Sequence, residues 1–371
     1  GEAERLTRSS VKILVFIIAP ISVGVFVLSS PLISLIYERG TFTSSDTALT
    51  ASALGAYACG MIFAAVGEIE SLIREWKPDI VHTHSSFSGK LAAYRRHVPC
   101  RFYTRHCTFP QPYYLTHFPM KQINGLINET LATDIIAVAK AAADDLTATG
   151  IRENRIRVII NGVEPVRITE KSERDALRKS LGIEDGAFVC GISARLEEYK
   201  GHSYLLESAR EVLLSHPNAY FLIIGSGSCE ESLRRTAKEY GIDKNVIFTG
   251  FVNDVAPYYN IMDLNLNCSV GTETSSLALS EGMSVGVPAV ATTYGGNPYM
   301  VTDGVNGFLV PERDPHAMAE KICLIAEDAG LREKLSRGAR EQYEKKFTAS
   351  AMTRQLEECY EESAKKHGIT K

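Results

Sequence analysis

Hydrophobic positions follow two different patterns along the chain, and the pattern changes near Glu68. Before that residue, the stretches 13–37 and 47–67 contain no charged side chain. A helix needs about 20 apolar residues to cross a bilayer, so each stretch is long enough to do so. A signal peptide fits the first stretch poorly, because the apolar run is too long and no cleavage site is clear. The second is less apolar, so it also fits a buried helix.

After Glu68, short runs rich in β-branched residues alternate with amphipathic segments. The first helix is predicted at 68–76 and is followed, after Pro78, by a buried strand. Strands are predicted at 79–84, 100–106, 134–140 and 156–163, and then at 188–194, 219–227, 245–250, 263–269, 288–294 and 307–311. Strands separated by helices of this length predict βαβ units and parallel sheets. The two series predict two doubly wound α/β domains, with a boundary near Pro165–Arg174.

Composition narrows the class of protein. Of the 371 residues, 23% are charged and 45% are hydrophobic, as in an ordinary globular chain. The formal net charge of -4 and the absence of a basic run argue against nucleic acid as a partner. The eight cysteines are scattered without a C-x-x-C pair, which is typical of reduced thiols in a cytosolic environment.

Polar and glycine residues gather where the strands of the second series end. These positions are Arg195 and Lys200 after the first strand, Gly225 after the second, Phe251 and Val252 after the third, and Glu273 to Glu281 after the fourth. Ligands of parallel sheets bind beyond the carboxyl ends of the strands. The set therefore predicts one binding site for a nucleoside diphosphate linked to a sugar.

Each group has a predicted part in that site. The backbone N–H groups of Ser275, Ser276 and Leu277, at the start of a helix, suit a phosphate. Arg195 and Lys200 can take up the charge that develops on a departing diphosphate. Glu281 can accept hydrogen bonds from ribose hydroxyls and Glu273 from those of the sugar. The two carboxylates thus suit neutral rings, while the cations and the helix dipole suit the phosphates.

Taken singly, these signals are weak. A lone Arg–Lys loop is most often a solvated surface, and the "GSGS" at 225–228 is most often a turn. The prediction of a nucleoside-diphosphate-sugar site rests on their occurrence together, in this order, at successive strand ends. No D-x-D motif is present, so we expect no metal ion and no further cofactor to be required.

At this point the chain resembles a retaining glycosyltransferase of the GT-B fold, family 4. The resemblance covers about residues 68–360. It rests on the motifs "KPDIVHTH", "NGV", "ARLEEYKG", "LIIGSGS", "NVIFTGFV", the Glu273–Glu281 E-x7-E signature, "GVPAVATTYGG" and "DGVNGFLVP".

The resemblance implies a role for each matching residue. Arg195 and Lys200 would bind the donor diphosphate, Glu281 the ribose and Glu273 the donor sugar. Phe251 and Val252 would frame the base. His106, after the strand "FYTRH", would face the reaction centre. His82 and His84 match an H-x-H strand end, although the residues alone make a structural role for His82 the more common case and leave His106 open.

The chain departs from this family in two places. It carries "ETSS" and "EGMS" where the family usually has "EGFG" and "EAMA", which predicts a changed contact to the donor sugar, and Tyr299 stands where an acidic residue is common. At the front, the first βα units of the N-terminal domain are missing. In their place, residues 1–67 resemble a fragment of a MurJ/MviN-type lipid II flippase, through "PLISLIYERGTFTSSDTALTASALGAYACGMIFAA".

We therefore expect a GT-B type fold with a truncated first domain. The predicted parts are a flippase-like helical segment (1–67), a partial acceptor domain (68–165), a nucleotide-sugar-binding domain (166–345) and a C-terminal helix (346–371). The expected activity is metal-independent transfer of a sugar, with retention, to a glycan or lipid-linked hydroxyl between the domains. His106 and the aromatic stretch 109–119, which also fits a rigid proline-rich cover, would lie near that acceptor.

Residues 13–67 would anchor the chain at the cytoplasmic face of a membrane, since Arg5, Arg8 and Lys12 precede the first span. Two other functions stay open: a nucleotide-sugar-binding fusion protein with impaired catalysis, and a fragment of a membrane transporter.

Overall fold

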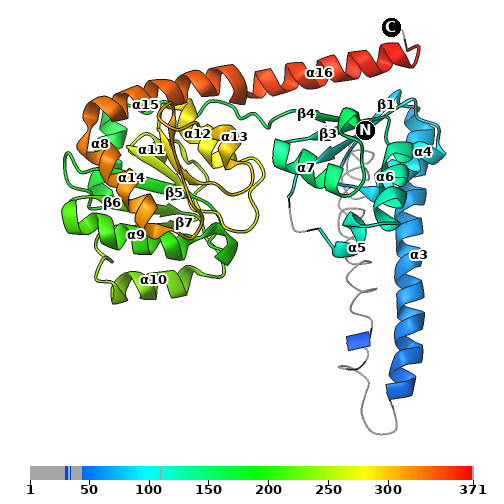
Figure 1. The fold of residues 1–371 in the computed structure, drawn as a ribbon, viewed down its shortest axis with the longest axis horizontal. Helices are drawn as coiled ribbons and strands as arrows, with labels where there is room; N and C mark the ends of the chain where they lie inside the picture. The colour runs from blue at the N-terminus through cyan, green and yellow to red at the C-terminus, as the bar shows by residue number, and fades with distance from the viewer. Residues whose placement is uncertain (1–29, 32–33, 35–43, 109–110, 370–371) are drawn as a thin grey trace, which may run out of the picture. The chain divides into compact units, whose positions relative to one another are not determined.

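The computed structural model describes residues 30–31, 34, 44–108 and 111–369 (Figure 1). The first predicted span, at 13–37, lies almost wholly outside the described residues, as do Arg5, Arg8 and Lys12. These predictions therefore stay predictions.

Helix α3 (Ser44–Trp76) joins two segments that the hydrophobic pattern predicts as separate helices. It contains both the second apolar stretch, 47–67, and the amphipathic stretch 68–76. No proline interrupts it, and a glycine such as Gly67 costs a helix only about 1 kcal/mol relative to alanine. Across the part of the chain that the structure describes, no helix combines the length and the apolar character needed to cross a membrane. The prediction of a transmembrane helix at 47–67 is therefore not confirmed.

The first sheet has four strands in the order in which they occur along the chain, β1-β2-β3-β4. They are β1 (Ile80–His84), β2 (Cys100–Arg105), β3 (Asp134–Ala137) and β4 (Ile156–Val158). β1 and β2 pair in parallel, with Ile80 opposite Cys100. The intervening helices are α4 (Phe87–Arg95), α5 (Tyr113–Thr116), α6 (Met120–Leu131) and α7 (Lys140–Ala148).

The second sheet has six strands in the order β10-β9-β8-β5-β6-β7, and every pair is parallel. The strands are β5 (Val189–Ser193), β6 (Tyr220–Ile224), β7 (Val246–Gly250), β8 (Leu264–Asn267), β9 (Ala289–Thr292) and β10 (Gly307–Val310). From β5, the strands β6 and β7 are added in turn on one side. The chain then crosses to the other side of β5, where β8, β9 and β10 are added in turn. Each predicted strand is present, although shorter than predicted.

Helices cover both faces of the second sheet (Figure 1). They are α8 (Lys171–Ser180), α9 (His202–Ser215), α10 (Glu230–Glu239), α11 (Ala256–Tyr259), α12 (Leu277–Ser284), α13 (Asn297–Met300), α14 (Pro315–Glu327) and α15 (Ala329–Gln342). A π-helical segment (Tyr343–Phe347) and α16 (Ala349–Lys366) follow.

Side-chain alternation along the strands explains the two helical layers. On β6, Phe221 and Ile223 belong to a core with α9, α10 and α14, whereas Leu222 and Ile224 belong to a second core with α8 and α11. Successive side chains of a strand point to opposite faces, so a strand buried on both faces is a continuous apolar run. The doubly wound architecture predicted for this part of the chain is confirmed.

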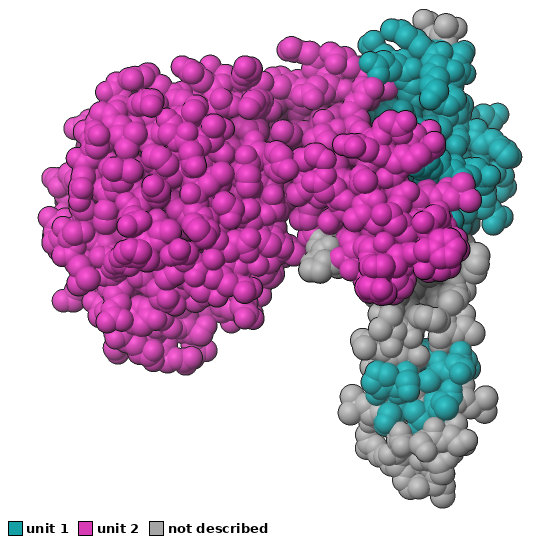
Figure 2. Space-filling view, viewed as in Figure 1, with its two compact units in different colours: residues 1–104, 127–135, 360–371 teal, residues 105–126, 136–359 magenta. Residues whose placement is uncertain are grey.

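The chain divides into two compact units (Figure 2). One consists of residues 1–104, 127–135 and 360–371, and the other of residues 105–126 and 136–359. The second unit contains the whole six-stranded sheet. The predicted domain boundaries after residues 67, 165 and 345 stay predictions.

Candidate functional site

The candidate site lies where the strand order of the second sheet reverses, between β5 and β8. Cys190 of β5 pairs with Leu264 of β8. The helices that follow these strands, α9 and α12, belong to cores on opposite faces of the sheet. The loops that leave β5 and β8 therefore diverge, and this is where open parallel sheets form a crevice.

A cavity of about 220 Å³ opens at this point. Six residues of the predicted donor site line it: Arg195, Lys200, Glu273, Ser275, Ser276 and Leu277. Ile192, Ser193, Ala194, Leu266, Asn267, Ser269 and Ala278 complete the lining. The predicted meeting of the loops after the first and fourth strands of this series is thus confirmed.

Lys200 is positioned by a tight turn. It ends a short 3₁₀-helix, Glu198–Lys200, and is followed by Gly201 at φ +71°. A Cβ atom on residue 201 would lie 2.0 Å from the backbone oxygen of Cys268. Glycine is therefore required for the loop after β5 to pack against the end of β8, which brings Lys200 to the cavity.

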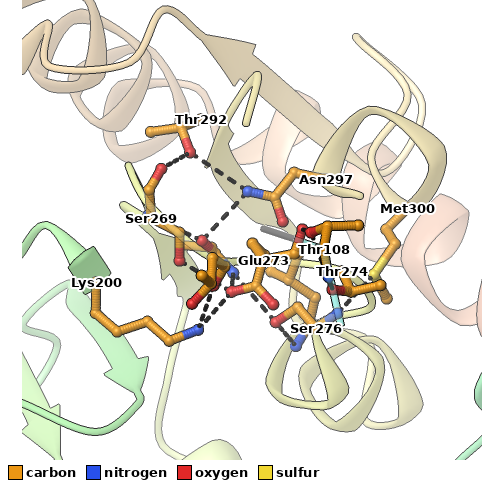
Figure 3. A network of polar contacts seen from close by, with 12 residues as sticks. Thr108, Lys200, Ser269, Glu273, Thr274, Ser276, Thr292, Asn297 and Met300 are labelled. Carbon is orange, nitrogen blue, oxygen red and sulfur yellow. Dashed lines mark hydrogen bonds and ion pairs between the residues drawn. The ribbon is translucent and has the colours of Figure 1, made fainter. Parts of the chain in front are cut away.

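The Glu273 carboxylate is held by three donors on one oxygen (Figure 3). Its Oε2 accepts hydrogen bonds from Lys200 Nζ at 2.8 Å, Ser269 Oγ at 2.9 Å and Asn267 Nδ2 at 3.1 Å. The side chain of Glu273 is 8% exposed and that of Lys200 is 17% exposed. Buried carboxylates are stable as anions only when they are paired and hydrogen-bonded in this way.

Asn267, which belongs to none of the motifs that predict the site, connects this carboxylate to the rest of the site. Its Nδ2 also donates to Ser276 Oγ at 3.1 Å, and its Oδ1 accepts from Asn297 Nδ2 at 3.2 Å. The Thr292 hydroxyl donates to the backbone oxygen of Ser269 at 2.7 Å. The available signal was the pair of asparagines in "DLNLN", on a strand whose four residues are all buried.

The start of α12 is arranged differently from the prediction in one respect. Ser276 is the N-cap, and its Oγ accepts from the Leu279 N–H at 3.3 Å. Its own N–H contacts Met300 Sδ at 3.2 Å and is thus already engaged. Ser275 Oγ is buried and has no partner among the residues that the structure describes. A phosphate would therefore depend chiefly on the N–H groups of Ser275 and Leu277.

Glu281 lies on α12 but outside the residues that line the cavity. Its Oε2 accepts from the hydroxyl of the buried Tyr259 at 3.0 Å. Burial raises the pKa of the Glu281 carboxyl, and the Tyr259 hydrogen bond partly opposes that rise. Its predicted contact to ribose stays a prediction.

The residues predicted to frame the base follow β6 and β7. The Gly225 N–H donates to the Gly250 oxygen at 2.9 Å, so the ends of these two strands are held together. Phe251 is 75% exposed, and Val252 packs against the core on the α8 side of the sheet. Gly225, Phe251 and Val252 do not line the 220 Å³ cavity.

His106 is half-buried, directly after β2. Two residues later, the Thr108 N–H donates to Thr274 Oγ1 at 2.9 Å, and the Thr108 hydroxyl donates to the Glu273 backbone oxygen at 3.4 Å (Figure 3). The segment that carries His106 thus contacts the loop that carries Glu273. The role of His106 stays a prediction.

His82 is hydrogen-bonded through both ring nitrogens. Nδ1 contacts the Tyr360 hydroxyl at 2.6 Å, and Nε2 contacts Thr104 Oγ1 at 2.7 Å. The ring also stacks on His84, with centroids 4.4 Å apart. These contacts favour the structural role for His82.

No three His, Cys, Asp or Glu side chains in residues 44–108 and 111–369 are grouped so that they could hold a metal ion. The donor set of the cavity, with Arg195, Lys200 and helix-start N–H groups, suits an anion.

Three family models match the chain. "Glycosyl transferases group 1" matches residues 173–342, "Glycosyltransferase Family 4" matches residues 50–167, and "Lipid II flippase MurJ" matches residues 1–73. The first match contains the entire cavity lining.

Individual proteins give the same assignment. The chain is 27% identical to the capsular polysaccharide biosynthesis glycosyltransferase CapM of Staphylococcus aureus, over 78% of each chain. It is 26% identical to the UDP-Gal:alpha-D-GlcNAc-diphosphoundecaprenol alpha-1,3-galactosyltransferase of Escherichia coli, over 70% of this chain and 69% of that one.

The fold also matches a solved structure, Anabaena Alr3699/HepE in complex with UDP, with a TM-score of 0.70 and 23% identity over 81% of this chain and 82% of that one. Residues 50–167 and 173–342 thus match two successive glycosyltransferase domain models, Glycosyltransferase Family 4 and then Glycosyl transferases group 1, and the chain is a glycosyltransferase.

Proposed function

We propose that this glycosyltransferase moves a sugar from a nucleoside-diphosphate donor to an acceptor hydroxyl, with retained anomeric configuration and without a metal ion. The observation that carries the proposal is the cavity at the strand reversal. It combines two cationic side chains, a helix start and a buried carboxylate. Cations and helix N–H groups suit a diphosphate, whereas a carboxylate suits the hydroxyls of a sugar.

The proposed reaction replaces one bond at the anomeric carbon with another on the same face. The acceptor oxygen forms a bond to C1 as the bond from C1 to the diphosphate oxygen breaks. The acceptor proton passes to the departing diphosphate. Arg195 and Lys200 would stabilise the negative charge on the leaving group, which is the role of fixed cations in group transfer.

Glu273 would accept a hydrogen bond from the donor sugar, and Glu281 from the ribose. His106 would face the reacting atoms. The acceptor would be a glycan or lipid-linked hydroxyl bound near the aromatic segment that follows His106. Tyr113 and Tyr114 there are largely exposed, and the rings of Tyr113 and His117 stack with centroids 3.7 Å apart.

The relatives offer a specific candidate for donor and acceptor. The name of the Escherichia coli relative specifies UDP-Gal as donor and a GlcNAc-diphosphoundecaprenol as acceptor. A UDP-hexose and a diphospholipid-linked sugar are therefore the first substrates to test.

We also propose that the chain acts at the cytoplasmic face of a membrane. The match of residues 1–73 to a flippase family and the basic residues Arg5, Arg8 and Lys12 support this. Membrane flotation of the full chain and of a chain lacking residues 1–67 would test it, and equal flotation of the two would contradict it.

The proposed function is tested by thermal stabilisation with UDP-glucose, UDP-galactose, UDP-GlcNAc and GDP-mannose, followed by product analysis. We expect one of these donors to raise the melting temperature and to release its nucleotide when a diphospholipid-linked sugar is added. EDTA should not change the rate, and NMR of the product should show the configuration of the donor.

Lys200→Ala should strongly reduce the stabilisation, since only Arg195 and the helix-start N–H groups then remain to bind the diphosphate. Lys171→Ala removes an exposed lysine on α8 and serves as the matched control. A stabilisation of Lys200→Ala equal to that of the wild type would contradict the assigned diphosphate site. Donor binding without transfer or hydrolysis would identify a binding module in place of an enzyme.

A further inference from the structure

Lys200 is engaged by two oxygens of the Glu273 loop while it lines the cavity. Its Nζ lies 2.8 Å from Glu273 Oε2 and 3.5 Å from the backbone oxygen of Thr272. The charged side chains that line the cavity are Arg195, Lys200 and Glu273. Because Glu273 neutralises one of the two cations, the lining has a formal charge of only +1. A diphosphate would therefore compete with Glu273 for Lys200.

Glu273 does not depend on Lys200 alone. Asn267 and Ser269 donate to the same oxygen, and both are fixed by further hydrogen bonds to Asn297 and Thr292 (Figure 3). A carboxylate that keeps two buried donors remains hydrogen-bonded when a third donor leaves. The lysine, by contrast, has a flexible stem and a compact charge that can turn toward another anion.

We propose that Lys200 alternates between Glu273 and the donor diphosphate, and that Glu273 thereby promotes release of the nucleoside diphosphate product. This inference rests on the proposed function. With an intact donor, a sugar hydroxyl takes the place of Lys200 on Glu273 Oε2 and compensates for the lost ion pair. After transfer the nucleoside diphosphate carries no sugar, so the ion pair between Glu273 and Lys200 forms again. The affinity for the product then falls, because Lys200 no longer binds its diphosphate.

The consequence is that a substitution harmful to transfer should strengthen product binding. Glu273→Gln removes the competing charge, so we expect the Kd for UDP to fall about tenfold, in the range for a hydrogen bond to a charged group. The same variant should bind the intact UDP-sugar no more tightly than the wild type does, because it loses the carboxylate acceptor. Inhibition of transfer by added UDP should become correspondingly stronger.

The experiment is a double-mutant cycle measured by calorimetry on the full chain, with UDP as the probe and GDP in parallel. The proteins are the wild type, Glu273→Gln, Lys200→Met and the double variant. Glu273→Gln should tighten UDP binding in the wild-type background and have no effect in the Lys200→Met background. Glu230→Gln removes one charge from an exposed pair with Arg234 on α10 and should leave UDP binding unchanged.

Three results would overturn the proposal. Equal UDP affinity of wild type and Glu273→Gln would show that Glu273 and the diphosphate do not compete for Lys200. Tightening that persists in the Lys200→Met background would assign the effect to general charge repulsion. Absence of UDP and GDP binding to every protein would overturn the donor site itself, and the inference with it. Glu273→Asp keeps the charge but shortens the reach to Lys200, so it should also tighten UDP binding and serves if Glu273→Gln folds poorly.

Discussion

The two sheets of this protein differ in the order of their strands, and the difference determines where a site can form. The six-stranded sheet reverses its direction of growth between β5 and β8, and the cavity lies at that reversal. The four-stranded sheet is ordered β1-β2-β3-β4 and has no reversal among the residues that the structure describes. In a sheet that grows in one direction, successive helices take the same face, so adjacent loops do not diverge.

Polar side chains at the two sheet edges differ accordingly. His82, in the first sheet, has both ring nitrogens bonded to Tyr360 and Thr104. In the second sheet, Lys200 faces a cavity, and Ser275 Oγ lacks a partner among the described residues. A polar residue at a strand end is therefore informative about binding only when the strand order around it is known.

The largest expected effect is on turnover at the reversal. Arg195→Ala should lower kcat/KM for the donor sugar by about 10²- to 10³-fold, because a cation that stabilises the leaving charge is lost. Arg234→Ala, an exposed arginine paired with Glu230 on α10, is the control and should keep wild-type kinetics. Steady-state rates of nucleotide release measure both. A loss of less than tenfold for Arg195→Ala would show that the cavity at the strand reversal is not where the leaving group is stabilised.

The next effect is on the stability of the second sheet. Gly225 follows β6 at φ +132°, and a Cβ atom there would lie 2.1 Å from the Ala194 backbone oxygen. Gly225→Ala should cost about 3 kcal/mol of unfolding free energy, from strain and a forced shift of the loop after β5. Gly182→Ala, at φ +71° with open space around it, is the control and should cost about 1 kcal/mol. Urea denaturation should show a larger loss of unfolding free energy for Gly225→Ala than for Gly182→Ala.

A third effect concerns pH. His202, at the start of α9, is buried, and neither ring nitrogen has a partner within the described part of the chain. Burial lowers its pKa to about 4. An unfolded histidine titrates near 6.5, so the unfolded state binds the extra proton first as the pH falls. The contribution of neutral His202 to the free energy of unfolding is therefore complete above about pH 6.5. It falls by up to about 3 kcal/mol as the pH is lowered to about 4.

His202→Leu should remove much of this acid sensitivity, measured as the melting temperature from pH 7 to pH 4. The exposed His117, replaced by Gln, is the control and should keep the wild-type profile. A profile of His202→Leu parallel to that of the wild type would contradict the prediction.

The smallest effect is expected at the edge of the first sheet. His82→Phe leaves the Tyr360 and Thr104 hydroxyls without their shared partner and should cost about 1–2 kcal/mol of stability. Donor binding should be unchanged, because His82 is held by structural contacts. Combining it with Tyr360→Phe should cost less than the sum of the single changes, since the two side chains interact. Weaker donor binding by His82→Phe would show that the first sheet also contributes to the donor site.

Much of the fold follows from the sequence. Each predicted strand is present, since a buried strand is recognisable from a short apolar run and a helix from its period. Arg195, Lys200 and Glu273 could also be named, because they stand at strand ends within recognisable motifs. The pattern predicts separate segments at 47–67 and 68–76 because the composition changes there, whereas α3 runs through both because no proline interrupts it.

The sequence by itself determined the strands, the helices and the residues at the strand ends, because local periodicity encodes them. The tertiary structure decided which of those ends meet and which side chains become partners. Asn267 reaches both Glu273 and Asn297, and Tyr259 reaches Glu281. Such contacts join residues up to 30 positions apart, and only the order of strands in the sheet brings them within hydrogen-bond distance.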